Sequence, residues 1–527
     1  MKALYKYITF SLVASVFVGC VDLDTAPESA YVTDEQKAET AQLDPTKIEA
    51  GVNAVFTQFS VYQNTITSSV RHNDFGYGAV MLFLDACGVD VVSADDGYNW
   101  MGNSLTFHDR TYTSNESTII WGTLYKQIYA LNNVVATIDP ETEDSTAQFY
   151  LAQALATRAF DYWVLAQLYQ FNYVGNESKL CVPLITDQNA STAGVEGCPR
   201  ATVTETYAQI MADIDKAITL LEKTEMKRAD NRYIDKGVAY GIRARVNLTM
   251  QKWSEALADA EKAIENGGAP YSMSDVSVPT FTEIEDWMWG IFIAETDRVV
   301  TSGIVNFPSH MGSLNYGYCN FTGGRQINKV LYNTIPESDV RKGWWLDENG
   351  VSPNLTPEQQ KVMEGYSYGP YTHTKYGPYK GELKTSTNAS DIPLMRVEEM
   401  YLIKAEAMAM SGNPSGAKAA LESFIKTYRD PEYTCYASSA GDIQKEVYRQ
   451  RRIELWGEGL SWFDIMRLKT GVDRRGGGFE SSTVFNISPD DNILLYRIPE
   501  SEIQANPLIP AEDNNPSAPR PTAVADN

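Results

Sequence analysis

The stretch between Val92 and Phe107 places aromatic rings and amides together in a segment that interrupts helical periodicity. Its centre is rich in Asp, Gly, Asn and aromatic residues and reads Asp95-Asp96-Gly97-Tyr98-Asn99-Trp100-Met101-Gly102-Asn103. An indole can stack on the apolar C–H face of a pyranose, and an amide can donate to and accept from its hydroxyls. We therefore expect Trp100 and Asn103, with Tyr98, to contact a sugar; an ordinary packed loop is the alternative.

Other candidate ligand contacts lie before and after this loop. Arg71, His72 and Asn73 can supply hydrogen bonds. The loop-rich second half adds aromatic candidates, of which we expect two or three to contact ligand: Trp287, Trp289, Tyr316, Tyr318, Trp344 and Trp345. In an extended chain Trp287 and Trp289 point to one side, whereas the adjacent Trp344 and Trp345 point to opposite sides, so one of the latter two belongs in the core.

Catalytic, metal and nucleotide chemistry find little support in the sequence. Hydrolysis of a glycoside needs two carboxylates at a suitable separation, and 68 acidic residues supply many accidental pairs. The four histidines lie far apart in the chain, and Gly476-Gly477-Gly478 lacks the strand and helix of a phosphate loop. We predict no enzyme activity, no cofactor and no metal. The net charge of −24 argues against nucleic acid as a partner.

The N-terminus carries the pattern of an export signal that ends in a lipidated cysteine. Lys2 and Lys6 precede an apolar run, and Phe17-Val18-Gly19-Cys20 fits a bacterial lipobox, with Phe17 where Leu is usual. We predict a signal peptide over 1–19 and a lipidated Cys20 with a flexible, acidic tether over 20–45. Ordinary secretion is the alternative. No later segment has the roughly 20 apolar residues that span a bilayer.

Five cysteines remain after Cys20, an odd number at irregular spacing. They fit neither a zinc module nor a disulfide framework. Cys181 and Cys198 could close a loop, but isolated buried thiols are favoured because free cysteine behaves as a small hydrophobe.

The elements that must position these residues are predicted to be helical. Apolar residues recur at steps of three and four, and helices are expected over 47–62, 119–138, 147–169, 204–221, 238–250, 254–265, 395–410 and 415–428. The pairs 238–265 and 395–428 have the alternation of small and large residues typical of tetratricopeptide repeats. We predict a mainly α body over 46–527, with helical hairpins at about 119–266 and 395–468 and a loop-rich ligand-binding insert at about 270–393.

Three segments resemble the SusD/RagB family of outer-membrane glycan-binding lipoproteins of Bacteroidetes, and the resemblance covers most of the chain. The segments are Asn73–Gly78 with Leu84-Asp85 and Gly88–Val91, then Leu394–Ala407, and finally Arg451–Gly459 continuing to Trp462–Arg467. Their charged residues lie beside apolar ones, so we expect structural ion pairs among Arg396, Glu398, Glu406, Arg452, Glu454, Glu458, Asp464 and Arg467.

The resemblance implies a function as well as a fold. In that family a Trp followed three residues later by an Asn occurs at the glycan site, which Trp100 and Asn103 match. It further implies a lipid-anchored protein of the outer membrane, facing the cell exterior, that passes glycan to a SusC-like TonB-dependent porin. A peptide-capturing lid of the RagB type is one alternative, and a helical assembly scaffold without a small ligand is another.

Overall fold

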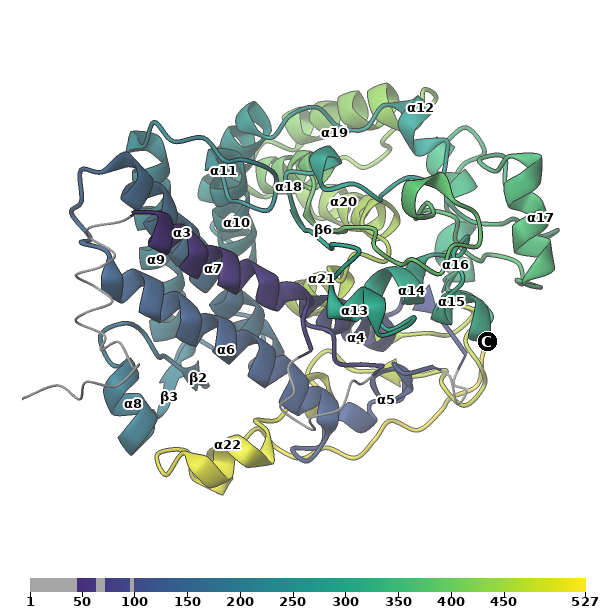
Figure 1. The fold of residues 1–527 in the computed structure, drawn as a ribbon. Coiled ribbons are helices and arrows are strands. Elements are labelled where there is room, and N and C mark those ends of the chain that lie inside the picture. The colour runs from purple at the N-terminus through teal and green to yellow at the C-terminus, as the bar shows by residue number, and fades with distance from the viewer. Residues whose placement is uncertain (1–44, 63–71, 95–98) are drawn as a thin grey trace, which may run out of the picture.

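The computed structural model describes residues 45–62, 72–94 and 99–527, whose fold is shown in Figure 1. The predicted signal peptide, Cys20 and the tether up to residue 44 lie outside the described residues, so these stay predictions. Within the described ranges, no helix combines the length and apolar character that crossing a membrane requires.

Long helices form one continuous stack across the molecule (Figure 1). They are α3 (Pro45–Thr57), α6 (Asn115–Thr137), α7 (Ser145–Tyr169), α9 (Val203–Lys223), α10 (Lys236–Thr249), α11 (Trp253–Asn266), α18 (Val397–Met410), α19 (Pro414–Tyr428) and α20 (Ala440–Glu454). Helix α3 packs on α6 and α7, and contacts then run from α7 through α9, α10 and α11 to α18, which packs on both α19 and α20. The predicted helical-hairpin scaffold is confirmed.

The stack also shows how the two predicted helical pairs, now α10–α11 and α18–α19, lie relative to each other. Their separation in the sequence argues against a regular repeat array, yet α11 packs directly on α18 although residues 267–396 lie between them. The insert departs from the helical stack and returns to it at the same place, because a strand near its start pairs with a strand at its end. Strand β4 (Trp289–Ile291) runs antiparallel to β6 (Ile392–Met395), with Ile291 opposite Ile392.

Capping residues explain where two of these helices begin. The sequence predicts this helix from residue 204, but α9 starts at Val203 and its cap is Thr202. The Thr202 hydroxyl accepts from the Glu205 N–H at 3.2 Å, and the Glu205 carboxylate accepts from the Thr202 N–H at 2.7 Å, which is a capping box. The break between the expected helices 395–410 and 415–428 is confirmed: Asn413 caps α19, and Pro414 is its first residue.

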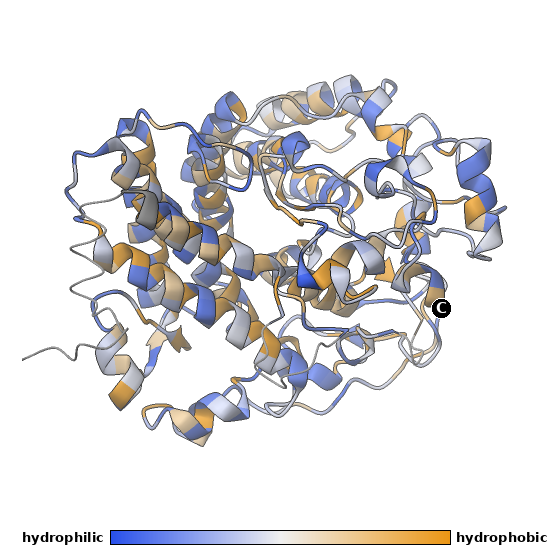
Figure 2. Ribbon diagram, in the orientation of Figure 1, coloured by the Kyte–Doolittle hydropathy of each residue, from blue (hydrophilic) through white to orange (hydrophobic). Residues whose placement is uncertain are grey.

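The insert between α11 and α18 is irregular, as expected. Besides β4 and β6 it contains α12 (Met273–Val276), η3 (Ile284–Asp286), α13 (Arg298–Thr301), α14 (Phe307–Met311), α15 (Tyr318–Phe321), β5 (Gln326–Ile327), α16 (Lys329–Tyr332), η4 (Val340–Trp344), α17 (Pro357–Gly365) and η5 (Tyr379–Gly381). Figure 2 shows α17, at the edge of the molecule, coloured mostly hydrophilic, and only Val362 and Met363 of this helix are buried.

The remaining elements belong neither to the helical stack nor to the insert. They are η1 (Gln58–Ser60), α4 (Tyr77–Cys87), β1 (Val91–Val92), α5 (Gly102–Leu105), η2 (His108–Arg110), β2 (Leu180–Pro183), α8 (Ala190–Glu196), β3 (Arg200–Thr202), α21 (Ser461–Leu468), β7 (Val472–Asp473), β8 (Asn486–Ile487), η6 (Asn492–Leu494), α22 (Glu500–Ala505) and η7 (Ala511–Asp513). Strand β1 pairs antiparallel with β5, with Val91 opposite Ile327, and this ties the segment after α4 to the insert.

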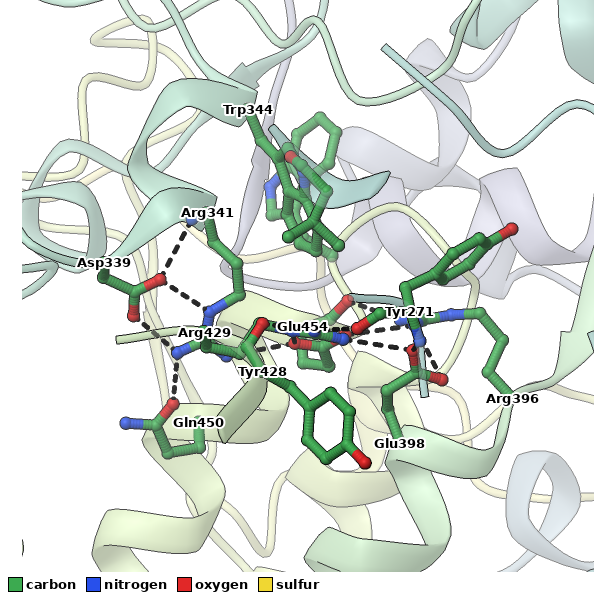
Figure 3. A network of polar contacts seen from close by, with 12 residues as sticks. Tyr271, Asp339, Arg341, Trp344, Arg396, Glu398, Tyr428, Arg429, Gln450 and Glu454 are labelled. Atoms are coloured by element: carbon green, nitrogen blue, oxygen red, sulfur yellow. Dashed lines mark hydrogen bonds and ion pairs between the residues drawn. The ribbon is translucent and has the colours of Figure 1, made fainter. Parts of the chain in front are cut away.

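A buried ionic network joins the insert to α18 and α20 (Figure 3). Glu454 accepts hydrogen bonds from Arg341, Arg396 and Arg429, and all four side chains are at most 1% exposed. The predicted ion pairing of the charged motif residues is confirmed, because each of the eight has a charged partner. The pairs are Arg396–Glu398, Arg396–Glu454, Arg396–Glu458, Arg452–Asp90, Arg467–Asp464 and Arg467–Glu406.

The cysteines of the described residues are all buried free thiols, including Cys181 and Cys198. The loop-closing disulfide that the sequence left open is therefore absent from this part of the chain. Burial raises the pKa of the Cys181 thiol to about 11, so it stays protonated and packs as an apolar group.

Candidate functional site

A half-exposed indole, Trp100, stands at the centre of the candidate site. Its ring is 37% exposed and stacks on the imidazole of His72, with 4.5 Å between the ring centroids and 13° between the planes. The ring of Tyr318 meets both at an angle, 5.2 Å from His72 and 6.3 Å from Trp100. One face of the indole is thus held by protein, and the ring remains accessible to solvent.

Three elements that are distant in sequence supply these rings. Trp100 precedes α5, a short helix within the predicted loop, and the carbonyl of Asn99 accepts from the Gly102 N–H at 2.8 Å. His72 lies in the turn that leads into α4. Tyr318 opens α15, where its N–H donates to the Ser309 hydroxyl at 3.0 Å.

A column of stacked rings supports the cluster from behind. Tyr318 stacks on His310 at 4.9 Å and 21°, and His310 stacks in turn on Phe75 at 5.7 Å and 21°. Burial lowers the pKa of His310 to about 3, so this imidazole is neutral and can pack against the other rings. Burial also lowers the pKa of His72, whose Nδ1 shares a hydrogen bond with the Tyr318 hydroxyl. At neutral pH the column carries no charge.

A buried carboxyl group orients the two amides at the edge of this cluster. Glu116, in the first turn of α6, is 1% exposed, and its Oε1 accepts from Asn103 Nδ2 at 2.9 Å and from Asn73 Nδ2 at 3.3 Å. Burial and the nearby charge of Asp109 raise the pKa of Glu116. Asn103 itself is exposed, and because its N–H group faces Glu116, its Oδ1 is the atom that a ligand hydroxyl can reach.

A second exposed aromatic pair lies on the same segment as Tyr318. Tyr316 is 44% exposed and Phe321 is 41% exposed, and their rings meet edge to face at 5.4 Å. The backbone fixes this segment, since the Tyr316 N–H donates to the Thr385 carbonyl at 2.8 Å.

The structure brings together part of the predicted set. Trp100, Asn103, Asn73 and Tyr318 meet around His72 and Glu116, and Tyr316 lies nearby in the chain. Arg71 and Tyr98 lie outside the described residues. Sequence reasoning missed Glu116, His310 and Phe321. Glu116 has no sequence signal beyond its place in a first helical turn, because its role depends on two amides from other segments.

Three predicted ligand contacts are wrong because their rings are buried. Trp287, Trp289 and Trp344 are 3%, 0% and 0% exposed and have no face to offer a ligand. Trp289 sits in β4 and packs edge to face on Phe160 at 5.1 Å. The indole N–H of Trp344 donates to the Val276 carbonyl at 2.8 Å.

Trp345, also among the aromatic candidates, is 1% exposed. The sequence predicts one of the adjacent pair Trp344 and Trp345 in the core, and both lie there.

Fold and site together define a helical-repeat protein with an open aromatic surface on its loops, and comparison with known proteins gives its family. A family model described as "SusD family" matches residues 317–516, and one described as "Starch-binding associating with outer membrane" matches residues 82–248. SusD-like protein P2 of Formosa agariphila is 23% identical over 97% of this chain and 99% of its own length.

Solved structures show the same fold. A SusD-like carbohydrate binding protein from Bacteroides vulgatus is 24% identical, with a TM-score of 0.72 over 90% of this chain and 99% of that chain. A laminarin binding SusD-like protein is 17% identical, with a TM-score of 0.60 over 90% of this chain and 99% of that chain. The chain belongs to the SusD/RagB family.

Proposed function

We propose that this protein is a cell-surface glycan-binding lipoprotein that captures an oligosaccharide and delivers it to a SusC-like TonB-dependent porin. The observation that carries the proposal is the Trp100 indole, held flat against His72 and open to solvent, with the exposed Asn103 oriented beside it. A pyranose stacked on the indole would place a hydroxyl within reach of Asn103 Oδ1. The family description as starch-binding and the laminarin-binding structural relative support this ligand class.

The proposal is binding without turnover. Glycoside hydrolysis requires two carboxylates that face the scissile bond, whereas Glu116 is 1% exposed and engaged with two amides. The uncharged ring column suits a neutral sugar. The lipobox supports a lipid anchor at Cys20, and the acidic tether supports an outward-facing orientation. The family description as associating with the outer membrane supports the location in that membrane.

Affinity electrophoresis tests the ligand class. The chain from residue 21 onward, without its lipid, is run through native gels that contain starch, laminarin or other plant and host polysaccharides. We expect retardation of the parent by at least one neutral glycan and clearly weaker retardation of Trp100→Ala by the same glycan. Tyr129→Ala is the matched control, since Tyr129 is a 62% exposed aromatic on α6 outside the site.

The result that would overturn the ligand class is retention by no glycan, or equal retention of parent and Trp100→Ala. A peptide pull-down that succeeds where the glycan panel fails would favour the peptide-capturing alternative. Copurification of a TonB-dependent porin with the full-length lipoprotein tests the partner. Protease treatment of intact cells tests display: a protein left uncut would contradict an outward-facing anchor.

A further inference from the structure

A cavity of about 680 Å³ lies between α20 and the loop that follows α19. Its walls come from three segments: Pro336 and Ser338, the loop residues Asp430, Glu432, Tyr433, Thr434, Tyr436 and Ala437, and the α20 residues Asp442, Lys445, Glu446 and Arg449. None of these residues belongs to the Trp100 site, and α20 and α5 lie in separate parts of Figure 1. Its volume is within the range of about 300–1,000 Å³ typical of small-molecule sites.

Hydrogen bonds hold the polar wall of this cavity in place. The hydroxyl of Tyr433, a residue only 6% exposed, donates to Glu446 Oε1 at 2.7 Å. Arg449 donates to both Glu446 oxygens, at 2.9 and 2.6 Å, and to the Thr334 carbonyl at 3.2 Å. Because these side chains are already ordered, they lose little conformational entropy when a ligand binds to them.

The rim of the cavity carries Tyr436, which is 90% exposed. The preceding residue anchors the loop, since Cys435 is 1% exposed and its N–H donates to Glu422 Oε1 at 2.9 Å. Among the residues that the structure describes, Tyr436 has no ring contact and no hydrogen bond. A large aromatic ring is thus presented to solvent beside a preformed polar cavity, and such a ring can stack on the apolar face of a sugar.

The charges of the lining select among ligand classes. Four carboxylates face two cations, which disfavours a phosphate or another anion. Glu446 is paired with Arg449, and Asp442 lies 3.5 Å from Lys445. Glu432, at the exposed rim, and Ser338 are then available to accept from hydroxyls. Acceptors next to an aromatic ring match a neutral, hydroxyl-rich ligand.

We propose that this cavity is a second carbohydrate-binding site, in which a neutral sugar residue stacks on Tyr436. The inference rests on the proposed function, because it assigns a further contact with the same class of ligand. Two sites on different parts of one protein would engage a long polysaccharide together, and linked binding of this kind raises apparent affinity by about 10²–10⁴ over one site.

Calorimetric titration with laminarin- and starch-derived heptasaccharides tests the second site. We expect two heptasaccharides bound per chain in the parent and in the Tyr129→Ala control, and one in Tyr436→Ala and in Trp100→Ala. On laminarin or starch itself, Tyr436→Ala is expected to bind at least about tenfold more weakly than the parent. Its melting temperature should match that of the parent, because the ring is exposed.

The outcomes separate the two proposals. If Tyr436→Ala binds like Tyr129→Ala while Trp100→Ala loses all binding, the second site is refuted and the proposed function stands. If the parent binds no glycan, both are refuted.

Discussion

Replacing Glu454 by Gln removes the central anion of the buried network while preserving its shape. Glu454 accepts from Arg341 at 3.1 Å, from Arg396 at 3.0 Å and from Arg429 at 2.8 Å. In Glu454→Gln an N–H₂ group replaces one carboxylate oxygen and points at guanidinium donors. Both hydrogen bonding and charge balance are then lost at a site without access to water.

The magnitude follows from the charge balance of the network. Four cations meet four anions in it: Arg341, Arg396, Arg429 and Lys375 with Asp339, Glu398, Glu454 and Glu458. The substitution leaves one buried positive charge uncompensated, which costs about 3–5 kcal/mol of unfolding free energy. With an unfolding entropy near 1 kcal/mol/K for roughly 500 residues, the melting temperature should fall by about 3–5 °C.

The effect should depend on pH in a defined direction. Burial opposes ionisation of Glu454, but Arg429, Arg396 and Arg341 outweigh it and hold the pKa of Glu454 well below its usual range. A carboxylate with a depressed pKa stabilises the fold above its unfolded pKa, about 4.5, and this stability is lost as pH falls through the folded pKa. The gap between parent and variant should therefore be full near pH 7 and narrow below about pH 4.5.

Thermal unfolding followed by circular dichroism measures this gap at pH 7.5 and at pH 4. Lys262→Ala is the control, because it breaks an exposed pair with Glu265 and is expected to change the unfolding free energy by less than about 1 kcal/mol. If Glu454→Gln melts within 1 °C of the parent at pH 7.5, the reasoning about the buried network is refuted.

Three further substitutions test other parts of the structure. Burial raises the pKa of Asp85 to about 8, so the parent loses stability as pH rises from 4 to 8. Asp85→Asn should remove this loss, which reaches about 4 kcal/mol near pH 7. Thermal melts in which parent and variant show the same dependence on pH would contradict this. Gly76 has a φ of +83°, and a Cβ there would lie 2.3 Å from the Phe59 carbonyl oxygen, so Gly76→Ala should lower the unfolding free energy by about 2–4 kcal/mol in urea titrations. A neutral effect would refute the clash. Glu116→Ala frees the amide of Asn103 to rotate and should weaken glycan binding by about 2- to 10-fold in calorimetry, whereas unchanged affinity would show that Asn103 needs no orientation.

Much of the fold was predictable because its signals are local. Helical periodicity located α6, α7, α10 and α11 to within a few residues. The start of α19 at Pro414 follows from a local backbone constraint, since proline fits the first position of a helix. The start of α9 was predicted one residue late, at Thr204 instead of Val203, because Thr202 and Thr204 are both good caps. The packing of α11 on α18 was not predictable, since it depends on the insert closing on itself through two short strands.

The candidate site was predictable only where exposure follows from the local sequence. Trp100 lies in a polar, glycine-containing loop with little demand from the core, and its ring is open to solvent. Trp289 and Trp344 also lie in loop-rich sequence, but contacts from distant segments bury them. Whether an aromatic residue in irregular sequence faces solvent is decided by such long-range packing, which single-sequence patterns do not contain.

Glycan binding at Trp100 is measured best by calorimetric titration of parent and Trp100→Ala with a heptasaccharide of the glycan that retains the parent in gels. We expect Trp100→Ala to bind at least about 30-fold more weakly, because it loses a central aromatic contact worth about 2 kcal/mol or more. The two sites are fitted separately in this titration. The melting temperature of Trp100→Ala should equal that of the parent. Equal affinity and stoichiometry in parent and variant would show that Trp100 does not bind the glycan.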